Sequence, residues 1–397
     1  MLFKELLTDE LNRQREEFRQ FARSQAGDLE FYADELERFG AIDYAEIRRK
    51  LGEQYDCGAL PSEELARARN FALGFDERWA NHEEARRWAF AVLENRTTFA
   101  ADGSQLFAER EVSLPVAAVQ IGWFENPHNA AAGYEKNAKF FVLSPAELLS
   151  LDEPVIPETR VGQRRFEEEI AKAKEFLQRK AGWRERGERM PLAFYDGTLL
   201  LSIALPKTLL QTALIAQLVE LARLSRDTRV PLIGYVDRSY ARDLMAMLDA
   251  FAGRRGGTIK TLDDVSVLHA GGLRNWGDRT PFCYARRHGL EAFIDPRTNE
   301  SLAGFVYLQT TSDNPPARLD IPSWIYEDGL LDEVVDTVRA ECVIGLGYPY
   351  ALETADQTAV ITLRDREVFL QALQGFAKEN NLNLRVSRKA ASKGRRR

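Results

Sequence analysis

The sequence predicts a mixed α/β fold, and three observations support this expectation. Hydrophobic residues make up 45% of the 397 residues, which is enough to bury a large core. From about residue 96 onward, apolar runs typical of strands alternate with segments of helical periodicity. Before that point, apolar residues recur at helical spacing among many charged ones. We therefore expect an N-terminal helical arm over residues 1–95, a sheet-containing domain over residues 96–387 and a basic tail over residues 388–397.

The order of the expected strands and helices specifies the sheet further. Three apolar runs separated by turn residues predict an antiparallel meander of strands at 97–101, 116–124 and 139–143. Later strands are expected at 192–196, 231–236 and 305–310, and helices at 164–180, 208–224, 330–340 and 351–364. A last helix and a short strand near 382–386 follow, whereas residues 255–320 show little organisation beyond their one strand. This order predicts an RNase H-like mixed sheet flanked by helices.

Charge limits where a nucleic acid can bind. The net charge of −7 argues against a surface that is basic throughout, so any contact with nucleic acid must be local. Two basic segments are available for such a contact, namely the arginines at 160, 164 and 165 and the tail over residues 388–397. For the tail, a solvated end without a binding role is an equal alternative.

Cysteine spacing and hydropathy favour a cytoplasmic protein. Cys57, Cys283 and Cys342 lie far apart in sequence, which predicts free thiols in a reducing compartment. The first residues do not show the pattern of a signal peptide. No apolar stretch approaches the roughly 20 residues that a membrane span requires. We therefore expect no membrane association.

Two aspartates follow apolar strands in the same local pattern. Asp102 ends the first expected strand, and Gly103 after it lets the backbone turn and a ligand approach. Asp196 ends a later strand and is again followed by a glycine and a hydroxyl residue. Aspartates at the ends of neighbouring strands repel each other unless a cation or a shared proton offsets their charge. The alternative for Asp102 is a structural role in which it caps the turn through Ser104 or nearby amides.

One glutamate of the helix expected at 164–180 lies on its apolar face. At about 100° per residue, Glu169 falls inside the stripe of apolar residues, whereas Glu168 falls outside it. A buried carboxylate needs a partner, because burying an unpaired charge is costly. That partner is either a metal ion shared with the two aspartates or an arginine such as Arg165.

The helix expected at 351–364 repeats this argument near the C-terminus. Its apolar stripe includes Asp356, while Glu353 lies at the edge of the stripe. Just before it, the hydroxyl of Tyr348 is a candidate to orient a phosphate or a metal-bound water. Ordinary core packing is the alternative for Tyr348. Asp237 also ends an expected strand, and for it helix capping with Ser239 is favoured over a role in the site.

These acids together suit a divalent metal that prefers oxygen ligands. Carboxylates of this kind favour Mn²⁺ or Mg²⁺ over zinc, and the set comprises Asp102, Glu169, Asp196 and Asp356. Two such ions about 4 Å apart can activate a water and stabilise the leaving oxygen in phosphodiester cleavage. The four histidines show no HxxxH or HExxH spacing, so a zinc hydrolase finds no support.

The segments that carry these residues resemble the NurA nucleases. FAADGS, the inward glutamate, YDGTLL, YVDRS and GYPYALETAD occur in the order seen in that family, from about residue 96 to about residue 364. The resemblance is weak between 255 and 320, and the arm is matched only in being helical. It implies that the family's acidic metal ligands correspond to Asp102, Glu169 and Asp196, and its C-terminal site positions to Tyr348 and Asp356.

Two details of this correspondence stay open. Family members often carry histidine where Asp356 stands, so its role in metal binding or in proton transfer is undecided. The family pattern does not choose between Glu168 and Glu169, and the preference for Glu169 depends on the helical-face argument.

The resemblance also implies an activity and partners. NurA proteins are manganese-dependent nucleases that act on single-stranded DNA and on duplex ends, as dimers with the hexameric HerA ATPase, in resection at double-strand breaks. We expect the same of this chain, with the helical arm as a candidate interface. The main alternative is a non-catalytic nucleic-acid or partner-binding protein on the same fold, in which arginines satisfy the acids. Another is a different RNase H-like enzyme, such as an RNA-directed nuclease or an Argonaute-like domain.

Overall fold

The computed structural model describes residues 3–108, 112–149, 157–202, 208–254, 261–298 and 300–385. Its internal contacts divide the chain into two compact units. The first unit comprises Met1–Trp79, Leu200–Lys207 and Gly234–Asp328, and the second comprises Ala80–Leu199, Thr208–Ile233 and Gly329–Arg397. The expected division into arm, domain and tail stays a prediction, and the basic tail lies outside the described residues.

The second unit contains the meander that the sequence predicts. Strands β2 (Thr98–Leu106), β3 (Ala117–Asn126) and β4 (Glu135–Leu143) pair antiparallel in that order, and β5 (Leu192–Asp196) lies parallel to β2 on its other side. The chain between β4 and β5 forms α6 (Pro157–Lys180), and after β5 it forms α7 (Leu209–Thr228), which leads into β6 (Leu232–Val236). Three antiparallel strands, a helix and a strand parallel to the first make up the RNase H-like arrangement. The predicted fold class is therefore confirmed.

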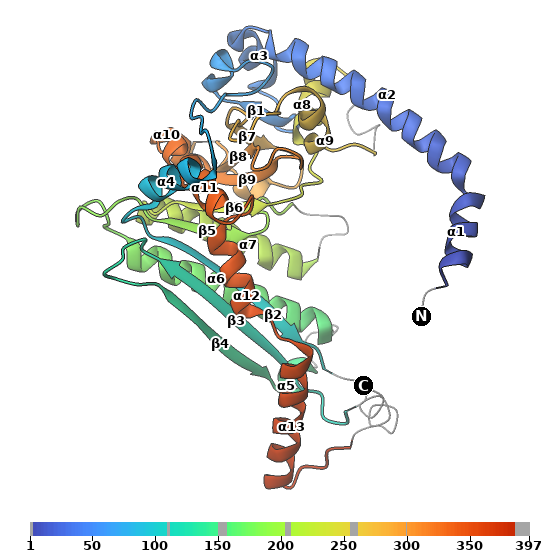
Figure 1. Cartoon of the computed structure of the whole chain (residues 1–397), viewed down its shortest axis with the longest axis vertical. Helices are drawn as coiled ribbons and strands as arrows, with labels where there is room; N and C mark the ends of the chain where they lie inside the picture. The colour runs from blue at the N-terminus through green and yellow to red at the C-terminus, as the bar shows by residue number, and fades with distance from the viewer. Residues whose placement is uncertain are drawn as a thin grey trace. The chain divides into compact units, whose positions relative to one another are not determined.

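Helices cover both faces of this sheet (Figure 1). Asp102 of β2 pairs with Gly122 of β3, so both residues point to the same face. A Cβ atom on Gly122 would meet the backbone of α12 (Tyr350–Ala359), whereas one on Gly103 would meet side chains of α6. Because successive strand residues alternate between faces, α12 lies on the face of Asp102 and α6 lies on the opposite face.

Apolar stripes and caps explain where the helices of this unit form. Helix α6 buries Ile170, Phe176 and Leu177 of the predicted stripe. Helix α7 begins at a capping box between Thr208 and Gln211. The other described helices of this unit are α4 (His82–Leu93), α5 (Pro145–Leu148), α11 (Leu331–Ile344) and α13 (Leu363–Glu379). Within the described part of the whole chain, no helix is both long and apolar enough to cross a membrane.

Two expectations near the C-terminus are wrong. The helix expected at 351–364 is two helices, because Thr362 and Asp365 form a capping box that begins α13 after α12 has ended. The apolar periodicity continues across this boundary, so periodicity alone does not reveal it. The strand expected near 382–386 is absent from its described residues, 382–385, and Val386 lies outside the described residues.

The first unit consists of antiparallel strands with helices. Its neighbouring strands are, in order, β1 (Gly58–Pro61), β7 (Cys283–Arg286), β8 (Ala303–Leu308), β9 (Ala317–Pro322) and the last residues of β6. Its helices are α1 (Lys4–Arg13), α2 (Arg15–Gly40), α3 (Tyr44–Leu51), α8 (Asp243–Phe251), α9 (Asp264–Gly271) and α10 (Ser323–Glu327), with short 3-10 helices η1 (Glu63–Arg67) and η2 (Glu291–Phe293).

Strand β1 corrects the expectation that residues 1–95 are entirely helical. At four residues, this strand is too short to show a periodicity of its own. Strands β7 to β9 organise much of the region 255–320 that the sequence left unassigned. Strand β8 corresponds to the one strand expected there, at 305–310, whereas β9 was not predicted because every residue of it is buried, which removes the alternation by which a strand is recognised.

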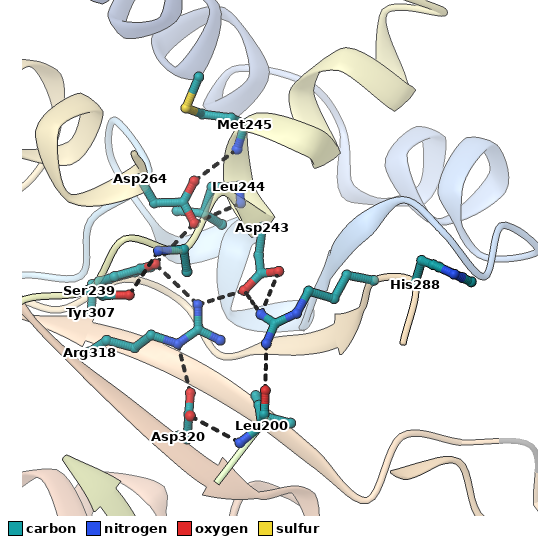
Figure 2. Close-up of polar contacts among 12 residues, drawn as sticks. Leu200, Ser239, Asp243, Leu244, Met245, Asp264, His288, Tyr307, Arg318 and Asp320 are labelled. Carbon is teal, nitrogen blue, oxygen red and sulfur yellow. Dashed lines mark hydrogen bonds and ion pairs between the residues drawn. The ribbon is translucent and has the colours of Figure 1, made fainter. Parts of the chain in front are cut away.

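A buried network of charges lies within the first unit (Figure 2). Arg318 of β9 donates hydrogen bonds to Asp320 at 2.7 Å and to Asp243 of α8 at 2.6 Å. The hydroxyl of Tyr307 donates to Asp264, and burial, together with the nearby charge of Asp243, raises the pKa of Asp264 to about 7. Removing one member of such a network leaves a buried charge uncompensated, at a cost of about 3–5 kcal/mol. The network therefore contributes to the integrity of this unit.

Candidate active site

Asp102 lies in the middle of β2 and not at its end. The strand continues to Leu106, and Gly103 pairs in regular register with Ile121 of β3. The expected turn after Asp102 is therefore wrong, and so is the turn-capping alternative. Gly103 has another effect, because a Cβ atom there would lie 2.5 Å from Arg165 Cγ and 2.5 Å from Glu169 Oε1. The glycine lets α6 bring these two side chains against the strand.

Glu169 is the glutamate of α6 that faces the sheet, as the helical-face argument predicts. Its residue exposure is 9%, and its carboxylate lies over Gly103. Glu168 forms an ion pair with Arg164 at 2.8 Å on the same helix. Of the two glutamates that the family pattern did not distinguish, Glu169 is therefore the one positioned beside β2.

The structure also contains the contact with Arg165 that was expected as the alternative partner for Glu169. Arg165 Nε lies 3.3 Å from Glu169 Oε1, and Arg165 Nη1 lies 3.4 Å from the carbonyl oxygen of Gly103. Both Arg165 Nε and Glu169 Oε1 are buried atoms without a hydrogen-bond partner among the described residues. The ion pair is thus a close approach of opposite charges without a well-formed hydrogen bond.

Asp196 is the last residue of β5, as predicted, and its carboxylate is exposed. Gly197 after it has a φ of +123°, a conformation that glycine adopts readily, so the chain turns at this point. The hydroxyl of Tyr348 donates a hydrogen bond to Asp196 Oδ1 at 3.4 Å. This contact brings a C-terminal site position next to the strand carboxylate.

Asp356 differs from its expected placement. The residue is exposed on α12 and does not face inward, although Ala355 and Ala359 beside it are buried as expected. Leu363, an apolar residue of the helix expected at 351–364, is exposed and belongs to α13. Asp356 nevertheless lies close enough to Asp102 to raise the pKa of Asp102 through its charge and a side-chain hydrogen bond. It therefore lies at the open side of the cluster.

The clustering of acids shifts their protonation. Burial raises the pKa of Asp102 to about 6, with Asp196 and Asp356 adding to the rise and the amide of Gly103 opposing it. Burial likewise raises the pKa of Glu169 to about 7. Arg165 lowers the pKa of Glu169, but burial and the charges of Asp102 and Asp196 outweigh this effect. The site thus holds excess negative charge that a proton or a cation would relieve.

The donor chemistry of this cluster fits a divalent cation that prefers oxygen ligands. Among the described residues Glu169 Oε1 is buried and has no hydrogen-bond partner, and burial raises the pKa values of both Glu169 and Asp102. As the side chains stand, however, the described residues contain no group of three or more His, Cys, Asp or Glu placed to hold a metal ion. Binding would therefore require side-chain movements that bring the carboxylates together.

One residue that supports the site was not identified from the sequence. Glu341 of α11 is 1% exposed and accepts a hydrogen bond from the amide of Ala351 at 2.9 Å, in the first turn of α12. Burial raises its pKa, and nearby His128 opposes this rise. By satisfying an amide at its start, Glu341 holds the helix that carries Asp356. The signal available in the sequence was a single acid in the apolar part of a helix.

The fold and the site together define an RNase H-like α/β protein with an acidic cluster along β2. The NurA domain model matches residues 96–361, which is more than half of the 397 residues. The chain belongs to the NurA family. This finding confirms the resemblance drawn from the sequence motifs. No curated protein matches the chain.

Several solved structures are similar to this chain at low identity. The NurA nuclease from Sulfolobus solfataricus is 13% identical with a TM-score of 0.47, and the match covers 72% of this chain and 85% of that one. A NurA structure with manganese is 10% identical with a TM-score of 0.39, covering 70% and 89%. The catalytic domain of human endonuclease V is 14% identical with a TM-score of 0.30, covering 74% and 96%.

Proposed function

We propose that this chain is a metal-dependent DNA nuclease that uses Mn²⁺, with Mg²⁺ as a possible substitute. The observation that carries this proposal is the acidic cluster in a NurA-family domain, where burial and mutual repulsion raise the pKa values of Asp102 and Glu169. The proposed metal ligands are Asp102, Glu169, Asp196 and Asp356. A bound divalent cation would supply activation of a water and stabilisation of the leaving oxygen.

The remaining tasks fall to the side chains. Asp102 on β2 and Glu169, whose carboxylate lies over the neighbouring Gly103, are the two partly or fully buried carboxylates that would hold the cation. Tyr348 already donates to Asp196, so it can hold that carboxylate in place or orient a phosphate oxygen. Asp356 lies beside Asp102 and is exposed, which suits proton exchange with solvent as well as metal binding.

The proposed substrate is single-stranded DNA and duplex ends, processed at double-strand breaks. Family membership supports this choice, and it also supports action as a homodimer with a HerA-type hexameric ATPase. The acidic net charge is consistent with a motor partner that supplies much of the grip on DNA. Helices α1 and α2 are the candidate interface, because they expose several large apolar side chains.

A comparison of substrates tests this proposal against its alternatives. End-labelled single-stranded DNA, blunt duplex DNA, RNA and an RNA–DNA hybrid are incubated with Mn²⁺ and with Mg²⁺. We expect cleavage of the DNA substrates and none of RNA. Preferred cleavage of RNA or of the hybrid would favour another RNase H-like enzyme. DNA binding without cleavage under any condition, with and without a HerA-type ATPase, would favour the non-catalytic protein, for which the Arg165–Glu169 pair is the supporting observation.

A further inference from the structure

Arg165 and Glu169 form an ion pair whose geometry is poor. The two nearest atoms, Arg165 Nε and Glu169 Oε1, are 3.3 Å apart, and neither has a hydrogen-bond partner within the described part of the chain although both are buried. The only hydrogen bond recorded for the Arg165 side chain within the described residues is the one to the Gly103 carbonyl at 3.4 Å. The guanidinium therefore contributes charge to the site without satisfying the carboxylate it faces.

A neighbouring pair on the same helix provides a comparison. Arg164 and Glu168 have the same spacing of four residues, and Arg164 Nη2 lies 2.8 Å from Glu168 Oε1. The i, i+4 spacing on α6 therefore allows both pairs to form the same contact. The looser contact of Arg165 with Glu169 reflects the position of the latter over β2 and not a limit of the helix.

The two members of the loose pair differ in their freedom to move. The side chain of Glu169 is 11% exposed and lies in the space left by Gly103, so it has little room. The side chain of Arg165 is 40% exposed and can turn toward solvent. The guanidinium thus lies beside the oxygen of Glu169 that a cation would bind.

We propose that Arg165 is the resident counter-ion of the acidic cluster and that a divalent cation binds by displacing it from Glu169. This inference rests on the proposed function, because it assumes that the cluster binds a metal ion. Arg165 then sets the cation concentration at which the site fills. A merely structural arginine would act in the opposite direction, because its removal would disorder Glu169 and weaken binding.

Direct titration of Mn²⁺ tests this assignment without measuring catalysis. The free Mn²⁺ signal in electron paramagnetic resonance gives Kd for the wild-type chain, for Arg165→Gln and for the matched control Arg164→Gln. We expect Arg165→Gln to lower the Kd about tenfold or more, because a competing unit charge is removed next to the ligand. Arg164→Gln should change it little, because that charge is already paired with Glu168. An unchanged or raised Kd in Arg165→Gln would overturn the inference.

Repeating the titration in a Glu169→Gln variant distinguishes competition at Glu169 from a general effect of charge. The Glu169→Gln variant lacks the carboxylate for which Arg165 and Mn²⁺ compete. Adding Arg165→Gln to this variant should therefore leave its Kd for Mn²⁺ unchanged. An equal gain in affinity with and without Glu169 would contradict direct competition. Arg165→Lys retains the charge and is expected to bind Mn²⁺ with affinity between those of wild type and Arg165→Gln, which keeps the test open if Arg165→Gln does not fold. Failure of the wild-type chain to bind Mn²⁺ would instead count against the proposed function itself.

Discussion

At the scale of single residues, strand and helix periodicity located most of the site. Asp196 ends its strand and Glu169 faces the sheet, and both placements follow from local rules about strand ends and helix faces. The exposure of Asp356 does not follow from such rules, because a periodic stripe does not say how far the covering sheet extends. Gly103 was expected to matter because it lets the backbone turn. In the structure it matters because it lets α6 approach β2 closely.

Replacing Gly103 with alanine should impair activity more than stability. The new methyl group would meet Arg165 Cγ and Glu169 Oε1 at 2.5 Å, so Glu169 must move away from β2. We expect cleavage to fall about tenfold or more and the free energy of unfolding to fall by about 1–3 kcal/mol. Cleavage rates and urea denaturation measure the two effects. Gly162→Ala is the control, because that glycine of α6 has nothing within 4 Å of the added atom and alanine there should stabilise the helix slightly.

The raised pKa of Glu169 predicts how stability depends on pH without metal. Its pKa rises from 4.5 to about 7 on folding, so between these values the folded state holds a proton that the unfolded state lacks. The free energy of unfolding should therefore increase as the pH falls from 8 to 5.5, by on the order of 1–3 kcal/mol from this group. Urea denaturation in EDTA at both pH values measures it. Glu169→Gln should be more stable than wild type at pH 8 and show a smaller pH dependence, and equal dependences would refute the assigned shift.

At the scale of helices and strands, the sequence predicted the core meander. It missed elements that were too short, or too uniformly buried, to show a periodic pattern. Strand β2 extends to Leu106 because it pairs with β3 along its whole length, which is a tertiary effect invisible in the local pattern at Asp102. The boundary between α12 and α13 depends on the cap at Thr362. Strand β8 was expected at 305–310, whereas β9 was missed because it is buried throughout and so lacks alternation.

The packing of α12 on β3 should be sensitive to Gly122. A Cβ atom there would lie 2.5 Å from the backbone nitrogen of Ala359 and 2.6 Å from the carbonyl carbon of Thr358, and backbone cannot move aside as a side-chain end can. Gly122→Ala is expected to lower the free energy of unfolding by about 1–3 kcal/mol or more, as measured by urea denaturation. Gly375→Ala in α13 has no atom within 4 Å and serves as control. Similar stabilities for the two variants would mean that α12 does not pack against Gly122.

At the scale of the whole molecule, the sequence predicted the family and the RNase H-like core but not the antiparallel unit built from distant segments. That unit joins residues near 58–61 to residues near 283–322, and pairing over such separations leaves no local trace in the sequence. The helical character of the first 51 residues was predictable because α1 and α2 keep their charged and apolar periodicity.

The exposed apolar residues of α2 predict a role in association. Phe18 and Phe21 are 55% and 51% exposed, and large apolar side chains exposed together on one helix indicate an interaction surface. We expect Phe18→Glu/Phe21→Glu to lower the molar mass from dimer to monomer in light scattering, or to abolish binding to a HerA-type ATPase. Arg19→Glu on the same helix serves as the charge control. Unchanged association in both assays would exclude this part of α2 as the interface.

The most direct test of the central claim is degradation of end-labelled single-stranded DNA with Mn²⁺, with Mg²⁺ and with EDTA. Wild type is compared with Asp102→Asn and Asp196→Asn, after thermal unfolding has shown that both variants fold. The account predicts cleavage that requires a divalent metal and is lost in both variants. A wild-type chain that is inactive with and without a HerA-type ATPase, or variants that cleave as well as wild type, would contradict the assignment of the acidic cluster as the catalytic site.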